Sequence, residues 1–311
     1  MKIYNDINAL NHIKNPVLTT GTFDGVHIGH REIIRRIREI ADKTGGETVL
    51  LTFEPHPRKV LFPNDENLRL LSTQQEKIAL LEQAGLDHLI FYPFSLEFSR
   101  LSALEYVRNL LVNGIGVHTM VVGYDHHFGR NREGDFNQLL EFASTYGFDV
   151  IEIPAQEIDE VNVSSTKIRK ALNEGDIQTA NRYLGYAYSL TGTVSKGAGI
   201  GKTIGFPTAN LETDMPEKLI PAQGVYAVKA HLNGKWHPAM LNIGTRPTVN
   251  SNGNTSIEAH IIGFNDEIYH QKLTLAFHAK IRNEHRFENL DELKAQLLLD
   301  EKRTLDLLKS L

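Results

Sequence analysis

Two histidines stand three residues apart near the start of the chain, in GTFDGVHIGH at positions 21–30. An apolar run over 17–20 precedes this stretch and apolar residues recur at helical spacing over 31–43, so the pattern predicts a strand, a glycine loop and a helix. His27 and His30 then share a face at the helix start, where backbone N–H groups bind anions. Two imidazoles there are suited to neutralise charge on phosphoryl oxygens. A turn with two histidines is the plainer alternative, and the flanking glycines, strand and helix favour the anion site.

A second stretch with phosphate-binding character lies at 195–210, with the sequence SKGAGIGKTIGFPTAN. Backbone N–H groups of such a glycine loop are able to wrap phosphates. Thr208 and Asn210 are two residues apart, so in an extended chain their oxygens point to one face and suit a hard Mg2+ ion. The P-loop and the dinucleotide-binding motif are excluded, because Lys196 and Ile204 stand where each requires a glycine. Taken alone, these residues also fit a plain Pro-Thr turn.

Three further polar segments follow predicted strands. The segment 52–58, TFEPHPR, has two prolines that fix its backbone, and alone it is typical of a stiff connecting loop. The segment 122–134 is rich in glycine and arginine, and its aromatic residues are able to stack on a ring. The segment 163–169, VSSTKIR, places hydroxyls and two basic residues at a helix start, where they act as N-caps or grip a triphosphate tail. His126 and His127 do not predict a metal site, because adjacent residues rarely chelate one ion together.

The elements that position these residues alternate between strand and helix from residue 17 to about 153. Strands are predicted near 17–20, 47–53, 87–92, 118–122 and 148–153, and helices near 30–43, 73–84, 103–113 and 134–146. Capping boxes are predicted at Ser72–Gln75 and Ser102–Glu105, and Gly114 is expected to end the third helix. The alternation predicts an α/β domain with a parallel sheet that binds ligands outside the carboxyl ends of its strands.

The second half of the chain has successive strands without helices between them. Strands are predicted at 188–195, 225–232, 235–242, 256–263 and 272–281, and a final helix from about Leu290. Asn233-Gly234 is a hairpin turn signal between two of these strands. The pattern predicts a small Greek-key β-barrel with a terminal helix. We place the domain boundary near 185, giving domains 1–184 and 185–311.

Composition is consistent with two globular domains, since 311 residues exceed one ordinary domain and 41% of them are hydrophobic. The net charge of −5 gives no basic signal for nucleic acid or an anionic membrane. The absence of cysteine excludes disulfides, thiol nucleophiles and cysteine-ligated metals. No signal-peptide core and no stretch of about 20 apolar residues is present, so we expect a cytoplasmic protein without nucleic-acid or membrane partners. The oligomeric state stays open.

GTFDGVHIGH resembles the HxGH signature of the nucleotidyltransferase superfamily, and in this longer form the prokaryotic bifunctional riboflavin kinase/FAD synthetase family. The triplet PHP and the segment SSTKIR are similar to two further motifs of that family, in the same order. The resemblance implies a Rossmann-like nucleotidyltransferase domain that transfers AMP from ATP to FMN. The implied catalytic residues are His27, His30 and Arg169. The implied ATP-binding residues are Gly21, Phe23, Asp24, Gly25, Asp125, Ser164, Ser165 and Thr166, and the implied flavin-binding residues are Pro55, His56, Pro57 and Phe128.

The stretch GTVSKGAGIGKTIGFPTANL is similar to the riboflavin kinase signature of the same family. The resemblance implies that the barrel phosphorylates riboflavin with ATP, and that Mg2+ serves both reactions. Thr208 and Asn210 are the implied metal ligands, and Glu258 is the implied general base. Gly197, Gly199 and Lys202 are the implied ATP-binding residues of the barrel, and Arg246 is an implied flavin-binding residue.

The sequence departs from the family pattern at four positions, which are His126, His127, Lys202 and His270. His270 replaces a common glycine, and Lys202 stands where arginine is common. These changes leave a protein with only one active half as the nearest alternative. An aminoacyl-tRNA synthetase-like protein is a second alternative. The sequence has no second lysine-rich loop and no excess of basic residues to support it. A non-catalytic flavin-binding protein is the third alternative, and the polar residues at both sites argue against it.

Overall fold

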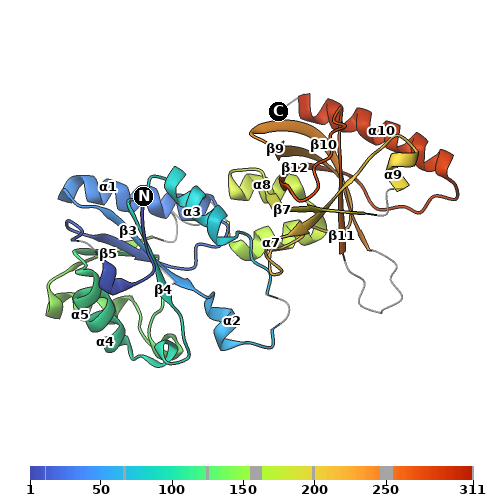
Figure 1. The fold of residues 1–311 in the computed structure, drawn as a ribbon. Helices are drawn as coiled ribbons and strands as arrows, with labels where there is room; N and C mark the ends of the chain where they lie inside the picture. The colour runs from blue at the N-terminus through green and yellow to red at the C-terminus, as the bar shows by residue number, and fades with distance from the viewer. Residues whose placement is uncertain are drawn as a thin grey trace. The chain divides into compact units, whose positions relative to one another are not determined.

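A computed structural model describes residues 1–10, 12–65, 68–123, 126–154, 163–197, 200–245 and 255–309. Two compact units, Met1–Ser164 and Ser165–Leu311, make up the chain. The first unit contains a sheet with helices and the second a closed barrel, which confirms the predicted fold class (Figure 1). The residues 165–184 belong to the second unit by this division, and the functional boundary near 185 stays a prediction.

All neighbouring strands of the sheet in the first unit run parallel. The strands are β1 (Lys2–Tyr4), β2 (Val17–Thr20), β3 (Thr48–Glu54), β4 (His88–Pro93), β5 (Thr119–Gly123) and β6 (Asp149–Ile153). Only the edge strand β1 was not predicted, because three residues leave no periodic pattern. In the order β1-β4-β3-β2-β5-β6, the chain adds strands first on one side of β2 and then on the other. Ligands of such sheets bind at this switch point between β2 and β5, where GTFDGVHIGH begins.

Helices cover both faces of this sheet, with α1 and α3 on one face and α5 on the other (Figure 1). The helices described in this unit are α1 (Ile28–Thr44), α2 (Pro57–Leu61), α3 (Gln74–Gln83), α4 (Ala103–Glu105), η3 (Tyr106–Ile115) and α5 (Phe136–Tyr146). The unit also has the 3₁₀ turns η1 (Ile7–Ala9), η2 (Phe98–Arg100) and η4 (Arg130–Arg132). Ile34 of α1 and Leu81 of α3 lie in one core cluster, and Leu110 of η3 and Leu139 of α5 in the other.

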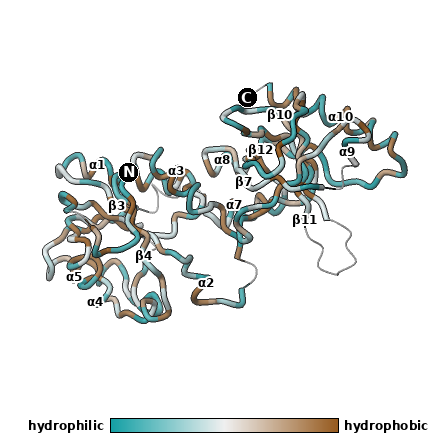
Figure 2. The backbone as a smooth tube through the Cα atoms, in the orientation of Figure 1, coloured by the Kyte–Doolittle hydropathy of each residue, from teal (hydrophilic) through white to brown (hydrophobic). Residues whose placement is uncertain are grey.

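The central strands are hydrophobic on both faces, as a buried parallel sheet requires. Val49 and Leu51 of β3 pack into one core cluster, and Leu50 between them packs into the other. Figure 2 shows the same property as hydrophobic colour along β4. This continuous apolar character is why the strand positions were predictable from sequence.

One of the two predicted capping boxes is confirmed and the other is wrong. Ser102–Glu105 forms the expected box at the start of α4. At α3 the box is Thr73–Glu76, one residue later than the predicted Ser72–Gln75. Ser72 is used elsewhere, because its hydroxyl accepts a hydrogen bond from the backbone N–H of Gly25 at 3.0 Å.

Gly114 does not end a helix, contrary to the prediction. The π-helix η3 continues past it to Ile115, and Gly116 takes the left-handed conformation at the C-terminus with φ of 72°. A Cβ on Gly114 would lie 2.6 Å from Ile7 Cδ1. Gly114 therefore permits the close packing of η1 against η3, a contact between distant residues that the local sequence does not reveal.

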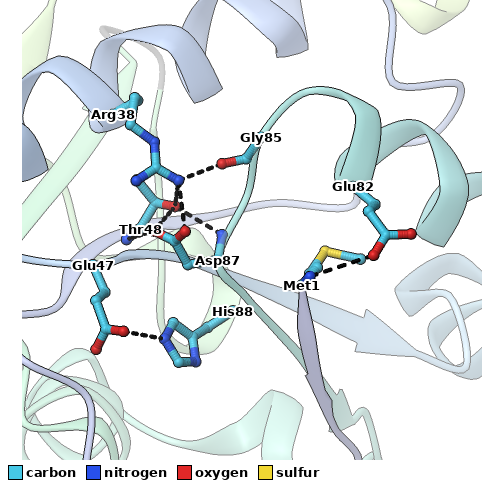
Figure 3. Close-up of polar contacts among 8 residues, drawn as sticks. All are labelled: Met1, Arg38, Glu47, Thr48, Glu82, Gly85, Asp87 and His88. Atoms are coloured by element: carbon cyan, nitrogen blue, oxygen red, sulfur yellow. Dashed lines mark hydrogen bonds and ion pairs between the residues drawn. The ribbon is translucent and has the colours of Figure 1, made fainter.

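The amino ends of β3 and β4 carry a cluster of paired charges (Figure 3). Arg38 of α1 donates a hydrogen bond to the Asp87 carboxylate at 2.7 Å. Asp87 also accepts hydrogen bonds from the Thr48 backbone N–H and hydroxyl, each at 2.9 Å. His88 Nε2 lies 3.3 Å from Glu47 Oε1. These groups satisfy one another at the amino ends of the strands, opposite to the switch point at the carboxyl ends. We therefore infer that they stabilise the fold and take no part in ligand binding.

The second unit is a barrel of six antiparallel strands in the closed order β10-β11-β8-β7-β12-β9. The strands are β7 (Ser189–Ser195), β8 (Ala209–Thr213), β9 (Gly224–Leu232), β10 (Lys235–Thr245), β11 (Thr255–Ile261) and β12 (Lys272–Arg282). The short strand β8 was not predicted, because Leu211 is its only large apolar residue. Asn233 and Gly234 have the positive φ of the expected hairpin turn between β9 and β10.

In the described part of this unit the helices are α7 (Ser165–Glu174), α8 (Ile177–Leu184), α9 (Ile200–Thr203) and α10 (Leu290–Lys309). The predicted terminal helix is confirmed as α10. Its Leu307 packs against Val225 and Ile281 of the barrel. Its Asp300, which is 1% exposed, accepts a hydrogen bond from Arg282 Nε at 2.9 Å. The buried ion pair therefore attaches α10 to the end of β12.

Candidate active sites

The first candidate site is the loop between β2 and α1. Phe23, Gly25 and Val26 in this loop have positive φ values of 45°, 82° and 36°. Such a backbone is unfavourable for phenylalanine and more so for β-branched valine, so it persists only where surrounding contacts hold it. Backbone strain of this kind clusters at functional sites.

The structure brings the two histidines of this loop into contact. His27 is the N-cap of α1, and its Nδ1 accepts a hydrogen bond from the His30 backbone N–H at 3.3 Å. Because Nδ1 accepts, neutral His27 carries its proton on Nε2, which is then a donor. The two rings stack with their centroids 3.7 Å apart, and Phe23 stacks on His30 at 4.4 Å.

His30 is held in its neutral form. Burial lowers its pKa well below the usual value, and the charges of His27 and Lys77 lower the pKa further. Within the described part of the chain, His30 Nδ1 is buried without a hydrogen-bond partner. A buried polar atom without a partner requires an explanation, and a catalytic role is one of those known.

Asp24 fastens the loop to the segment before α3. Its carboxylate accepts hydrogen bonds from the backbone N–H of Leu71 at 3.0 Å and of Ser72 at 3.1 Å. Asp24 is 3% exposed, so these bonds satisfy a charge that is almost fully buried. The position is one of support for the loop, and the predicted contact of Asp24 with ATP stays a prediction.

The predicted flavin-binding residues of the first unit lie after β3 and β5. Pro55 is exposed, and His56 is the N-cap of α2, which begins at Pro57. His56 Nδ1 accepts a hydrogen bond from the Arg58 backbone N–H at 3.2 Å. Phe128 is buried in a core cluster. Both segments follow carboxyl ends of strands, where ligands of parallel sheets bind.

The predicted pyrophosphate segment lies at the start of α7. Ser164 is the last residue of the first unit, and Ser165 is the first residue of α7. Thr166 is exposed and Arg169 half-buried, whereas Ile168 packs inward. Asp125, the other predicted nucleotide contact, lies outside the described residues. The approach of these residues to the histidine pair stays a prediction.

The second candidate site is a row of polar residues across neighbouring barrel strands. Strand register places Asn242 of β10 opposite Glu258 of β11, Glu258 opposite Asn210 of β8, and Asn210 opposite Ser195 of β7. Residues directly opposite in antiparallel strands project from the same face of the sheet. The predicted general base and one predicted metal ligand are therefore neighbours.

A cavity of about 310 Å³ opens beside this row. Glu258 and Thr208 both line it, together with apolar residues of the barrel and of α10 that include Leu293 and Leu297. Glu284 lines it as well, and accepts a hydrogen bond from the Asn242 amide at 3.4 Å. An apolar cavity with a few convergent polar groups is typical of a small-molecule site.

Gly197 makes room for one of the predicted metal ligands. A Cβ at this position would overlap the Asn210 side-chain amide, so the glycine lets the loop approach β8. Lys202 of α9 lines a second cavity together with Thr208. Gly199 and Arg246 lie outside the described residues. His270 has φ of 64°, so it adopts the left-handed conformation that a glycine would provide at this turn.

The oxygens at 208 and 210 fit a Mg2+ ion in chemical type. The hydroxyl of Thr208 and the amide oxygen of the buried Asn210 are hard donors, and Mg2+ takes few protein ligands besides substrate phosphates. Among the described residues, no three histidine, cysteine or carboxylate side chains gather to hold a metal ion, His126 and His127 included. In the same residues, no helix is both long and apolar enough to cross a bilayer.

Sequence reasoning missed Lys77 and Glu284, which lie beside the two sites. Lys77 of α3 is 8% exposed, and its ammonium group donates a hydrogen bond to the Thr22 carbonyl at 2.8 Å. The available signal was its spacing, since Lys77 lies four residues before the buried Leu81 on the apolar face of the predicted helix. No comparable signal marks Glu284, which follows the last strand in an exposed charged segment.

Comparison with known proteins assigns each half of the chain to a family. A family model described as FAD synthetase matches residues 10–167. A second, described as riboflavin kinase, matches residues 184–308. Together the two matches span most of the chain and include both candidate sites.

Similar proteins match over nearly the whole length. The bifunctional riboflavin kinase/FMN adenylyltransferase of Pseudomonas fluorescens is 38% identical over 91% of this chain and 90% of its own. The protein of the same name from Escherichia coli K12 is 37% identical over 97% of this chain and 96% of its own. A crystal structure described as a macrolide-efflux protein from Streptococcus pneumoniae has a TM-score of 0.88 and 29% identity, covering 97% of this chain and 98% of that one.

Proposed function

The chain belongs to the bifunctional riboflavin kinase/FMN adenylyltransferase family, and we propose that it makes both FMN and FAD. The barrel phosphorylates riboflavin with ATP, giving FMN and ADP. The sheet domain transfers AMP from another ATP to FMN, giving FAD and pyrophosphate. The observation that carries this proposal is the pair of separate sites in one chain, one with stacked histidines at a helix start and one with Glu258 beside Asn210.

In adenylyl transfer, a phosphate oxygen of FMN attacks the α-phosphorus of ATP and pyrophosphate leaves. His27 donates from Nε2 and His30 from its ring N–H to the oxygens on which charge builds up. Donors fixed before the reaction stabilise such charge without reorganisation. Ser164–Arg169 holds the leaving pyrophosphate, because hydroxyls and basic groups at a helix start are suited to phosphate.

In the kinase reaction, the primary hydroxyl of riboflavin attacks the γ-phosphorus of ATP and ADP leaves. Glu258 takes the hydroxyl proton as the bond forms. Thr208 and Asn210 hold Mg2+, which offsets the phosphate charge when bound. The apolar wall of the neighbouring cavity suits a flavin ring, and Glu284 with Asn242 limits where a polar group of the ligand can lie.

The functional domains that we propose are 1–184 for adenylyl transfer and 185–311 for the kinase. We also propose a cytoplasmic location and small-molecule substrates, and the net charge of −5 gives no support for a nucleic-acid partner.

The test is a product assay with purified protein, ATP and Mg2+. We expect FMN and FAD from riboflavin, and FAD from supplied FMN, as followed by chromatography. If neither FMN nor FAD formed from either substrate, the proposal would be refuted. A protein that converts only one of the two substrates would have one active half.

A further inference from the structure

Lys77 of α3 is a buried charge that the proposed chemistry does not use. Its side chain is 8% exposed, and burial lowers the pKa of its ammonium group, while Asp24 and Glu54 raise it. A charge is rarely retained at such a position, because desolvation is costly without a partner. The partner here is the Thr22 carbonyl, which accepts a hydrogen bond from Nζ at 2.8 Å.

Thr22 directly precedes the part of the loop with positive φ. The strained backbone at Phe23 and Val26 persists only where surrounding contacts hold it. Asp24 supplies one of these contacts through the backbone N–H of Leu71. Lys77 supplies another. The first contact involves the segment before α3, and the second comes from α3 itself.

Lys77 also lies close enough to His30 to act on its charge. The positive charge of Lys77 contributes to the low pKa of His30, after burial and the charge of His27. The carboxylates that influence Lys77 are Asp24 of the loop and Glu54 at the end of β3. A cation beneath the loop also adds to the positive potential of the helix start.

We propose that Lys77 is a positioning residue for adenylyl transfer, because its ammonium group holds the loop that leads into the histidine pair at the start of α1 and adds a positive charge to the surroundings of His30. The inference rests on the proposed role of the histidine pair. It assigns to α3 a function in the reaction in addition to its function in the core.

The experiment compares Lys77→Met, Lys77→Gln and Lys77→Arg in the full chain. We expect Lys77→Met to lower kcat for FAD formation from FMN about 10²-fold, the cost of misplacing catalytic groups by about 1 Å. Lys77→Gln keeps an N–H donor without the charge, and Lys77→Arg keeps both. We therefore expect the loss to decrease in the order Met, Gln, Arg. Gln75→Met, at an exposed position of α3, is the matched control.

An NMR titration of the His30 ring in the free protein distinguishes this positioning role from a merely structural one. The His30 signal is assigned by its absence in His30→Asn. Removing the nearby positive charge favours the imidazolium, so the His30 midpoint should move to higher pH in Lys77→Met and Lys77→Gln. In Lys77→Arg it should stay at the wild-type value. An unchanged midpoint in a folded neutral variant overturns the inference, as does an Arg variant that loses as much kcat as Met.

Riboflavin phosphorylation by the same variants should stay within about twofold of wild type. Failure of the wild-type protein to make FAD would refute the proposed function. The His30 titration would still test the position and charge of Lys77, because it needs no substrate.

Discussion

The two candidate sites are built on different principles. In the first unit, the histidines lie where a strained loop runs into α1, and this loop is held by two contacts: Asp24 of the loop bonds the Leu71 backbone, and Lys77 of α3 bonds the Thr22 carbonyl. In the barrel, Glu258 and Asn210 come from different strands, and the register of pairing sets their spacing. The first site should therefore be sensitive to substitutions in its supports, whereas the second should be sensitive mainly at the reacting groups themselves.

The largest effect is expected for Glu258→Gln. The amide cannot accept the hydroxyl proton, and general-base catalysis contributes about 10²–10⁴-fold in rate. FMN formation from riboflavin should fall by about that factor, while FAD formation from supplied FMN continues. Both rates are measured by chromatography of the products. Glu212→Gln, an exposed carboxylate of β8, is the matched control, and an equal loss in both variants would remove Glu258 from the mechanism.

His30→Ala should have the next largest effect, on the other reaction. Loss of one preorganised donor to a transition-state charge costs about 10²–10³ in kcat. With riboflavin and ATP, the variant should accumulate FMN and form little FAD. A variant that keeps FAD formation but loses FMN formation would reverse the assignment of the two sites.

Much of the fold was predictable from sequence, whereas the roles assigned to the residues of both sites stay predictions. Apolar runs such as Leu50 with its neighbours mark strands because they are buried on both faces, and the spacing of His27 and His30 marks a helix start. The supports were not predictable. Ser72 looks like a helix cap in the sequence, and only the fold shows that it binds the loop 47 residues away. The role of Lys77 is likewise visible only in the fold, where its ammonium group bonds the Thr22 carbonyl.

Asp24→Asn tests the supports and should have a smaller effect. The amide retains the shape of the side chain but loses the charge that accepts from the backbone of Leu71 and Ser72, and poorly satisfied buried groups cost about 1–3 kcal/mol. We expect this decrease in the free energy of unfolding of the first unit, with a fall in FAD formation and unchanged kinase activity. Urea unfolding and both product assays check this. Equal loss of both activities would contradict the view that the support serves one site.

The smallest effect should appear in the dependence of stability on pH. Burial holds the pKa of His30 well below the value near 6.5 expected in the unfolded chain. Between these two pKa values the unfolded state binds a proton that the folded state does not, so stability is full above about pH 6.5 and decreases as the pH falls, by at most about 1.4 kcal/mol per pH unit. Urea unfolding at about pH 7.5 and about pH 5.5 should show this loss in wild type and a smaller loss in His30→Asn. Because His278, whose pKa burial also lowers, is unchanged between the two proteins, the difference isolates His30, and an identical loss in both would show that His30 is not held neutral by the fold.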